Sequence, residues 1–429
     1  MSDLGQAIRF ASRLYRERTA NLYAGYVRRD PMALVGLRPG RDNPYALYER
    51  MRADGPLVRI GRNSWAGTSH RVCDAVLRDR RFGVRPVNPD GTEGDLGMDL
   101  SLLGMNPPDH TRLRRLVQPA FSPKVVAGYR GPIEDRVGEL LDRAGTDGEF
   151  DLVSAFAAPL PIGVITDLLG IPDVDAERFA RYGAIVGSAL DGIRSLRHAA
   201  QLQASDTEMN ELFDGLVELR RREPQDDIVT RLVQAEGDVI RPEEITSLCG
   251  VLLVAGFETT VNLIGNSVLA LLDHPAQWEA LCADPKGMAP KAVQEVLRFD
   301  PPVQGTTRFA REPLELEGRA LARGQWVVTL IGAANRDPQI YDRPDTFDIS
   351  REDAADNLAF SSGIHYCVGQ PLARLEAEIA LQLLAERMPG LIRSGAAKRR
   401  NSTSIRGPIR LPVRAGRAGV PSGMAPLTR

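Results

Sequence analysis

The segment from Arg241 to Asp273 constrains the fold of this 429-residue chain more than any other feature. Apolar residues occupy nearly every side of the helix that it predicts, among them Ile245, Leu248, Val251, Leu252, Val254 and Ala255. A helix that is apolar all round is buried at the centre of a large protein. We therefore expect this segment to be the central helix of the fold.

The rest of the chain is mainly helical before residue 300 and mixed after it. Apolar residues at three- and four-residue steps predict helices over 109–118, 132–144, 154–169, 175–190, 197–222 and 226–235, with others over 44–51, 70–78 and 367–388. Strand patterns cover 57–60, 64–68, 314–316 and 325–330. Residues 82–104 show no periodicity and predict a long loop, typical of a lid. The sequence therefore predicts a mainly α fold with a smaller β portion.

Charge and cysteine content exclude several classes of protein. Lys and Arg total 54 and Asp and Glu total 56, and this balance argues against wholesale nucleic-acid binding. Since no run of about 18 apolar residues is present, we expect no membrane span. The four cysteines, Cys73, Cys249, Cys282 and Cys367, form no CxxC pair or zinc framework. Scattered thiols indicate a reducing compartment, the cytoplasm.

The first thirty residues contain six arginines and no uninterrupted apolar stretch of a targeting signal. Ile8, Leu14, Tyr15 and Leu22 fall partly on one face of a predicted helix. Such a helix can lie on a membrane surface, which is one alternative. Because its apolar face is weak and interrupted by charge, we expect it to pack on the protein body instead.

An irregular loop leads into the cysteine at position 367. Its sequence is Phe360-Ser361-Ser362-Gly363-Ile364-His365-Tyr366-Cys367-Val368-Gly369, and a helix is expected to begin at the cysteine. A thiolate there faces unpaired backbone N–H groups and the positive end of the helix dipole, which lower its pKa. Gly363 and Gly369 let the backbone approach the sulfur, and Phe360 can exclude water. The pattern favours a metal-bound thiolate, the alternative being a buried cysteine after a glycine loop.

A second segment, Ala255-Gly256-Phe257-Glu258-Thr259-Thr260, lies within the long central helix. Small residues at 255 and 256 leave room on one face, and the Thr259 hydroxyl can bond back to the Ala255 carbonyl. A groove beside a carboxylate and a hydroxyl suits O₂ binding and relayed protons. Two threonines that merely cap backbone groups are the alternative.

These segments together resemble the cytochrome P450 family. The cysteine loop matches the pattern F-G-x-G-x-H-x-C-x-G, except that Ser361 replaces the first glycine. Residues 255–260 match A-G-x-[DE]-T-[ST], and Glu295 and Arg298 match the E-x-x-R helix. The resemblance covers roughly residues 40–415 and implies one large domain, with haem between the long central helix and the cysteine loop. Residues 1–39 are then an N-terminal extension, and 416–429 a flexible C-terminal tail.

The resemblance also implies a role for each motif residue. Cys367 is the iron ligand, while Thr259 steadies the bound oxygen and Glu258 helps to relay protons. The residues implied to bind the haem are Ala255, Phe360 and Gly369, together with His110, Arg114, Arg308 and His365 at its propionates. The implied structural group is Glu295 with Arg298 and Arg343. The implied substrate pocket contains Val251, Val254, Val303, Gln304 and Ile405.

By this resemblance the chain is a soluble bacterial haem-thiolate monooxygenase. It is expected to bind haem b (iron protoporphyrin IX) and to insert one oxygen atom from O₂ into a small organic substrate by hydroxylation or epoxidation, tailoring a secondary metabolite such as a polyketide or macrolide. The chain has no flavin or nicotinamide module, so electrons from NAD(P)H are expected through a ferredoxin and its reductase, with Arg112, Arg115 and Arg374 as a candidate docking patch.

Two alternatives stay open at this point. The same fold can act without oxygen insertion, as a peroxide-driven enzyme, a dehydratase or a recruitment protein. A more distant alternative is an α-helical interaction protein with incidental cysteines and no cofactor.

Overall fold

The long segment predicted from Arg241 to Asp273 forms the central helix, α13 (Pro242–Asp273), in the computed structural model of the chain. The structure describes residues 12–415 apart from 13, 17, 89, 95–99, 146–147, 173–175, 190–192, 194 and 238. Within that part of the chain, α13 is the only helix long and apolar enough to cross a membrane, and 78% of its apolar window is buried inside the protein. Its burial is that of a core helix.

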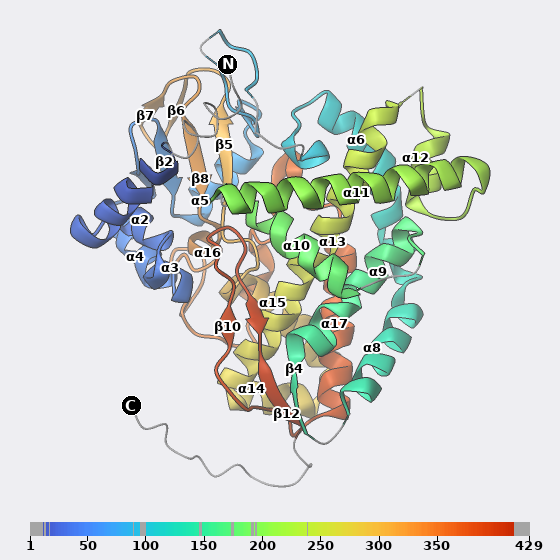
Figure 1. Ribbon diagram of the computed structural model, residues 1–429. Coiled ribbons are helices and arrows are strands. Elements are labelled where there is room, and N and C mark those ends of the chain that lie inside the picture. The colour runs from blue at the N-terminus through green and yellow to red at the C-terminus, as the bar shows by residue number, and fades with distance from the viewer. Residues whose placement is uncertain are drawn as a thin grey trace.

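Helices surround α13 on most of its length (Figure 1). The helices that pack against it most closely are α9 (Pro159–Leu169), α10 (Ala176–Ala189), α11 (Leu196–Arg222), α15 (Pro285–Phe299) and α17 (Gln370–Arg387). A further long helix is α8 (Arg130–Ala144), and α12 (Ile228–Gln234) and α14 (Pro275–Ala283) are short helices in the second half of the chain. The shorter helices are α2 (Pro31–Val35), α3 (Arg38–Asp42), α4 (Tyr45–Ala53), α5 (His70–Arg78), α6 (Asp109–Val117), α7 (Pro123–Ala127) and α16 (Ile331–Ala334). These bounds confirm the predicted helical majority.

The β portion consists of small sheets at the side and bottom of Figure 1. The largest sheet has the order β1-β2-β8-β5-β3, in which β2 and β8 run parallel and the other neighbours antiparallel. Its strands are β1 (Leu57–Arg59), β2 (Ser64–Gly67), β3 (Phe82–Gly83), β5 (Thr306–Ala310) and β8 (Trp326–Thr329). The other strands are β4 (Gly148–Asp151), β6 (Leu314–Leu316), β7 (Arg319–Leu321), β9 (Ile392–Arg393), β10 (Lys398–Arg399), β11 (Pro408–Arg410) and β12 (Pro412–Ala415).

The N-terminal helix does not pack on the body as we expected. Tyr15, Leu22 and Tyr26 are 62%, 40% and 55% exposed. By contrast, Val35 in α2 is buried in one cluster with Tyr48 of α4, so the packed body begins before residue 40. The apolar face of the N-terminal helix is weak and interrupted by charge, so it can bury too little area to hold this helix against the protein body. The predicted tail at 416–429 lies outside the described residues, as does Ile8.

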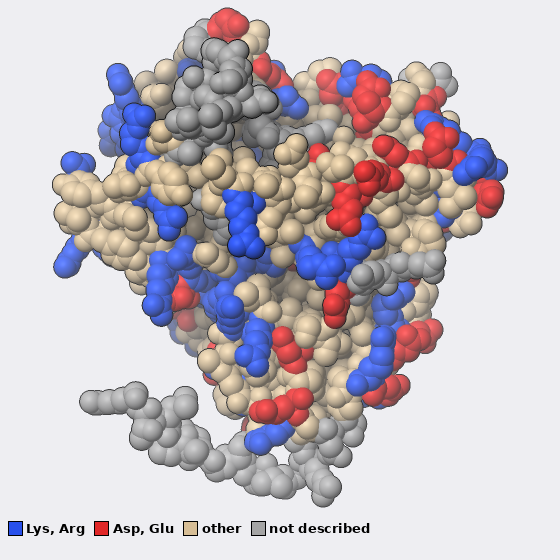
Figure 2. Space-filling view, in the orientation of Figure 1, with Lys and Arg blue, Asp and Glu red and all other residues tan. Residues whose placement is uncertain are grey.

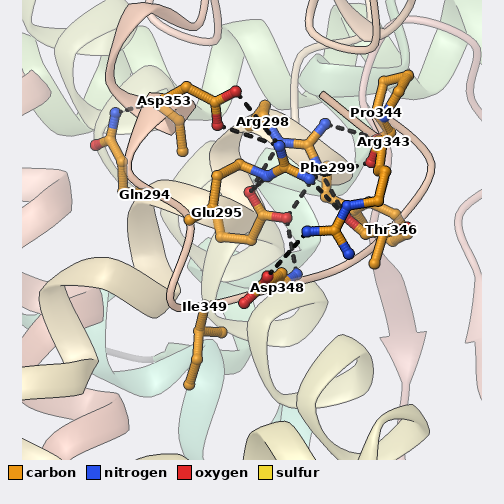
Figure 3. A network of polar contacts seen from close by, with 12 residues as sticks. Gln294, Glu295, Arg298, Phe299, Arg343, Pro344, Thr346, Asp348, Ile349 and Asp353 are labelled. Atoms are coloured by element: carbon orange, nitrogen blue, oxygen red, sulfur yellow. Dashed lines mark hydrogen bonds and ion pairs between the residues drawn. The ribbon is translucent and has the colours of Figure 1, made fainter. Parts of the chain in front are cut away.

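A buried ion pair holds α15 to the chain that precedes the cysteine loop (Figure 3). Arg298 donates from Nε and Nη2 to the two carboxylate oxygens of Glu295, both at 2.8 Å, and both side chains are fully buried. The same guanidinium donates to the carbonyls of Pro344 (2.7 Å) and Thr346 (3.0 Å). One saturated cation therefore fixes the segment around residues 344–348 in place.

The prediction that the Arg343 side chain joins Glu295 and Arg298 is wrong. This side chain is 64% exposed and lies 3.1 Å from Asp342. It also lies 3.9 Å from Asp348 (Figure 3). The arginine beside Glu295 is Arg351, whose Nε lies 3.4 Å from Oε2 and whose side chain is 5% exposed. Arg343 has a left-handed backbone (φ 43°), and its carbonyl oxygen accepts a hydrogen bond from Arg351 Nη2 at 3.0 Å. Its main chain joins the cluster while its side chain turns outward.

Replacing Arg298 by Met should lower the free energy of unfolding by about 3–5 kcal/mol, because it leaves a buried carboxylate with too few donors. Arg351→Ala should cost less, and Arg343→Ala should stay within about 0.5 kcal/mol, since its ion pairs are exposed. Urea unfolding of the three variants measures the loss of unfolding free energy in each, which should be largest for Arg298→Met and smallest for Arg343→Ala. An equal cost for Arg343→Ala and Arg351→Ala would contradict this assignment.

Candidate functional site

The cysteine loop depends on two residues with left-handed backbone. Ser361 has φ 66° and Gly363 has φ 68°. A Cβ on Gly363 would lie 2.5 Å from the Leu77 carbonyl oxygen, so glycine is required there on both grounds. Ser361, where the family pattern has glycine, keeps the same type of backbone despite its side chain. The N–H of Cys367 then donates to the Phe360 carbonyl at 2.9 Å and closes the loop.

Helix α17 begins at Gln370 rather than at the cysteine, with Gly369 as its N-cap and Pro371 in its first turn. The predicted start is therefore three residues early, since the loop continues through residue 369. The sulfur still faces the helix start, because the N–H groups of Gly369 and Gln370 donate to it. The predicted lowering of the Cys367 pKa is wrong for the thiol without a metal. Burial raises this pKa, and the two N–H groups and the charge of Arg114 oppose the rise without reversing it.

Four nitrogen-bearing side chains from three parts of the chain gather beside this loop. The rings of His110 (α6) and His365 lie 4.1 Å apart, and the charges of Arg114 and Arg308 act on His365. Burial lowers the pKa of His365 to about 3 and that of His110 to about 4, with nearby positive charge adding to both shifts. Burial also lowers the pKa of Arg308 to about 10. The structure thus brings all four predicted propionate residues together.

This cluster lacks acidic partners among the described residues. Arg308 is 6% exposed and donates only to Thr306 Oγ1 (2.9 Å) and the Thr307 carbonyl (3.0 Å). Nδ1 of His110 and Nε2 of His365 are buried with no hydrogen-bond partner in the described part of the chain. Buried donors left in this way are costly unless an anion meets them. A ligand with two carboxylates, together with a metal for the thiolate, fits this set of donors.

The middle of α13 contains the segment predicted to bind oxygen. Ala255 is exposed although residues 252–254 are buried, and Thr259 donates from Oγ1 to the Ala255 carbonyl at 3.2 Å, as predicted. Gly256 does not widen this face, because a Cβ there would lie 2.7 Å from Ile165 of α9. It lets the two helices pack closely. The Ala255–Thr259 face is therefore an accessible strip in the middle of α13, where most neighbouring residues are buried.

Glu258 is buried and forms an ion pair with Arg400, whose Nη2 lies 2.7 Å from Oε1. Burial raises the pKa of the Glu258 carboxyl, and Arg400 lowers it. Our sequence analysis did not predict Arg400, which lies in a run of basic residues far along the chain. No local pattern could have paired it with Glu258, because the contact depends on tertiary packing.

The predicted pocket residues separate into two groups. Val251 lies one turn before Ala255 on the same face of α13, and Val303 forms an antiparallel bridge with Ile405. The pocket role of Gln304 is wrong. Its side chain accepts from Tyr48 Oη (3.2 Å) and donates to the Pro301 carbonyl (2.8 Å), and it is 2% exposed. The Gln304 amide is hydrogen-bonded to the tyrosines of α4 inside the protein body. Val254, 9% exposed, lies on the Glu258 side of α13.

The predicted docking patch is weaker than expected. Arg112 is committed to an internal bridge, with both Nη atoms within 2.8 Å of the Glu244 carboxylate and Nη2 also 2.8 Å from Asp109. Arg374 lies 3.4 Å from Glu378. Arg115 is exposed.

Comparisons with known proteins identify the family. A family model described as Cytochrome P450 matches residues 288–388. The chain is 38% identical over 387 residues to cytochrome P450 monooxygenase PikC of Streptomyces venezuelae, covering 87% of this chain and 91% of that protein. It is 37% identical over 392 residues to 6-deoxyerythronolide B hydroxylase of Saccharopolyspora erythraea, covering 86% of this chain and 95% of that one.

A solved structure agrees with these relatives. Ligand-free CYP164A2 of Mycobacterium smegmatis matches with a TM-score of 0.83 and 37% identity, over 90% of this chain and 99% of that one. Such identity over most of both chains shows the family, and the structural match shows its single-domain fold. Members use a haem iron and O₂, and they act on small molecules with the help of redox partners. This chain belongs to the cytochrome P450 family and is a P450 monooxygenase.

Proposed function

We propose that this monooxygenase hydroxylates or epoxidises a polyketide-like or macrolide-like secondary metabolite, with Cys367 as the ligand of the iron of haem b. The observation that carries the assignment of Cys367 is its sulfur, which accepts two backbone N–H groups beside a cluster of buried donors. The substrate class is supported by the relative whose name makes it a hydroxylase of 6-deoxyerythronolide B. Val251, Val303 and Ile405 are the apolar residues that we assign to the pocket.

The chain's own residues then divide the work of holding the cofactor. Haem supplies the iron at which O₂ is activated. Arg308, Arg114, His110 and His365 would neutralise its two propionates, which gives each buried donor a partner. Phe360, Ala255 and Gly369 would contact the ring or cover the thiolate. The N–H groups at the sulfur would withdraw charge from it and so tune the reduction potential of the metal that Cys367 would hold.

Thr259 and Glu258 would supply protons on the side of the substrate. The Thr259 hydroxyl lies on the accessible face of α13, held by the Ala255 carbonyl, so it can donate toward a molecule in that space. Glu258 is buried one residue away and can exchange protons with water that reaches this face. Thr259 and Glu258 would therefore deliver protons on this face of α13, and they would not bind the substrate.

Electrons would come from NAD(P)H through a ferredoxin and its reductase, in the cytoplasm. All four cysteines are free, which agrees with a reducing compartment. Since Arg112 is held internally, Arg115 is the cation that we retain for ferredoxin docking.

The proposed ligand is tested by the absorption spectrum of the reduced protein under carbon monoxide. The wild-type protein should show the red-shifted thiolate-haem band, and Cys367→Ala should lose it. Product formation with NADPH, ferredoxin and reductase then separates oxygen insertion from the alternatives. Electron consumption without product, or product only with peroxide, would contradict oxygen insertion from O₂.

Arg308→Ala should weaken haem retention roughly tenfold to a hundredfold, because a charge-assisted hydrogen bond to a propionate is worth about 1.5–3 kcal/mol. The rate of haem transfer to excess apomyoglobin measures the loss. The control is Arg319→Ala, an exposed arginine in β7. Equal transfer rates for the two variants would remove Arg308 from the site.

Thr259→Ala should reduce coupled product formation about a hundredfold while NADPH consumption continues, since proton delivery of this kind contributes at least that factor. The matched control is Thr260→Ala. Thr260 makes the same local contact, to the Gly256 carbonyl at 3.2 Å, but is buried off the Ala255 face. If both variants uncouple equally, the position of the Thr259 hydroxyl is irrelevant. Hydrogen peroxide released per NADPH is the direct measurement.

A further inference from the structure

The carboxylate of Glu258 is enclosed between α10 and the β10–β11 hairpin. A Cβ built on Gly183 would lie 2.9 Å from Oε2, and one on Gly187 would lie 3.2 Å from Oε1. Helix α10 therefore presents bare backbone to this carboxylate. The side chain of Glu258 is 6% exposed. A buried carboxylate in such surroundings needs a cation.

Arg400 is the cation recorded against this carboxylate in the described part of the chain. Its Nη2 lies 2.7 Å from Oε1, and its side chain is 13% exposed. The backbone of Arg400 is fixed as well, because its N–H donates to the Gly407 carbonyl at 2.9 Å. The ion pair thus joins the central helix to the residue that follows β10.

The hairpin contacts α13 directly, one and two turns after Glu258. A Cβ on Gly407 would lie 2.0 Å from Asn262 Oδ1, and one on Gly265 would lie 2.8 Å from Pro408. Asn262 itself donates to the Glu258 carbonyl at 2.6 Å. Such close approach fixes the position of the hairpin along α13, and with it the position of Arg400.

Two neighbouring arginines of the hairpin are paired with another carboxylate. Arg406 Nε lies 2.7 Å and Arg399 Nη1 3.2 Å from the Asp300 carboxylate. Lys398 pairs directly opposite Arg410 across the strands, an unfavourable placement of like charges. Figure 2 shows Lys and Arg gathered on the face below α11, over the region where Figure 1 labels α3 and β10. The hairpin is therefore rich in positive charge, and Arg400 is its link to Glu258.

Arg400 also keeps the carboxylate away from the accessible face of α13. Thr259 and Ala255 share that face, since the Thr259 hydroxyl bonds the Ala255 carbonyl. Glu258 turns toward α10 and the hairpin, and no hydrogen bond between Glu258 and Thr259 is recorded among the described residues. Proton transfer from Glu258 to Thr259 therefore requires water between them or a change in the Arg400 contact.

We propose that Arg400 is the positioning residue of Glu258, holding its carboxylate between α10 and the hairpin and setting how readily it takes up and gives up protons. This inference rests on the proposed proton-relay role of Glu258. A proton from solvent binds a carboxylate oxygen as the contact with Arg400 loosens. The same proton then leaves toward the Thr259 side, and the restored carboxylate pairs with Arg400 again. Each cycle moves one proton and leaves both residues unchanged.

The first experiment measures the Glu258 proton itself, with no turnover. Infrared spectra of the purified protein across a pH series record the carbonyl stretch of protonated carboxyl groups, and Glu258→Gln identifies the band of Glu258. In Arg400→Gln the burial of Glu258 is no longer opposed, so the midpoint of this band should move to higher pH. The matched control is Arg399→Gln, which leaves Arg406 on Asp300 and should leave the Glu258 midpoint unchanged.

Arg400→Lys guards against loss of folding in Arg400→Gln. A lysine keeps the charge but makes only a point contact, so its midpoint should lie above that of the wild type and below that of Arg400→Gln. A Glu258 midpoint that is the same in the wild type, Arg400→Lys and Arg400→Gln would overturn the proposal. The proposal would also be wrong if Arg399→Gln shifted the Glu258 midpoint as far as Arg400→Gln does.

The second experiment uses turnover. The alkaline limb of the pH profile of coupled product formation should move to higher pH in Arg400→Gln, because Glu258 stays protonated longer, and it should be absent in Glu258→Gln. A merely structural role for Arg400 would lower the rate at every pH without moving this limb. If the infrared midpoint moves but the limb does not, the pair exists and the proton-relay role of Glu258 is wrong.

Discussion

Burying a 32-residue helix on nearly all sides is the constraint that organises this protein. Apolar side chains alone fill most of its surroundings, but close packing also requires bare backbone at defined points, as at Gly256 against Ile165 and at Gly183 against Phe257. The polar residues of α13 must then find partners inside the protein. Asn266 does so by donating to the carbonyls of Asp300 and Arg406, at 3.0 Å each. The helix that builds the core therefore also fixes the polar groups around the site.

The fold contains two buried polar groups of different kinds, one with all its partners inside the protein and one that lacks them among the described residues. The Glu295–Arg298 pair is complete within the chain, because each donor and acceptor meets a protein partner and none is left for a ligand. The cluster of His110, Arg308 and His365 is incomplete in the described part of the chain, with buried nitrogens that no protein atom meets. The first arrangement stabilises the approach to the cysteine loop. The second arrangement leaves buried donors that an anionic ligand would satisfy, beside the sulfur of Cys367.

The contrast between Arg343 and Arg351 shows that sequence patterns do not predict contacts between separate elements of the chain. Glu295 and Arg298 lie three residues apart on one helix, so their contact follows from helix geometry. Their third partner, Arg351, comes from an irregular segment eight residues after Arg343, where no helical spacing relates it to Glu295. Gln304 is similar, because the α4 tyrosines that bind its amide are distant in sequence. Local spacing predicts contacts within a helix or loop, and it cannot choose between two arginines of an irregular segment that packs against a helix from elsewhere in the chain.

The sequence by itself determined the central helix, the mainly α fold, the cysteine loop and the Thr259–Ala255 contact, because each depends on periodicity or on a short spacing along one element. It also identified the two arginines and two histidines that gather beside the cysteine loop, through the resemblance of their motifs to a family. Tertiary structure alone decided that Arg400 meets Glu258, that Arg351 meets Glu295, and that the N-terminal helix is exposed. These outcomes depend on how separate elements approach one another in space, and the free energy of that packing is shared among many residues far apart in the chain.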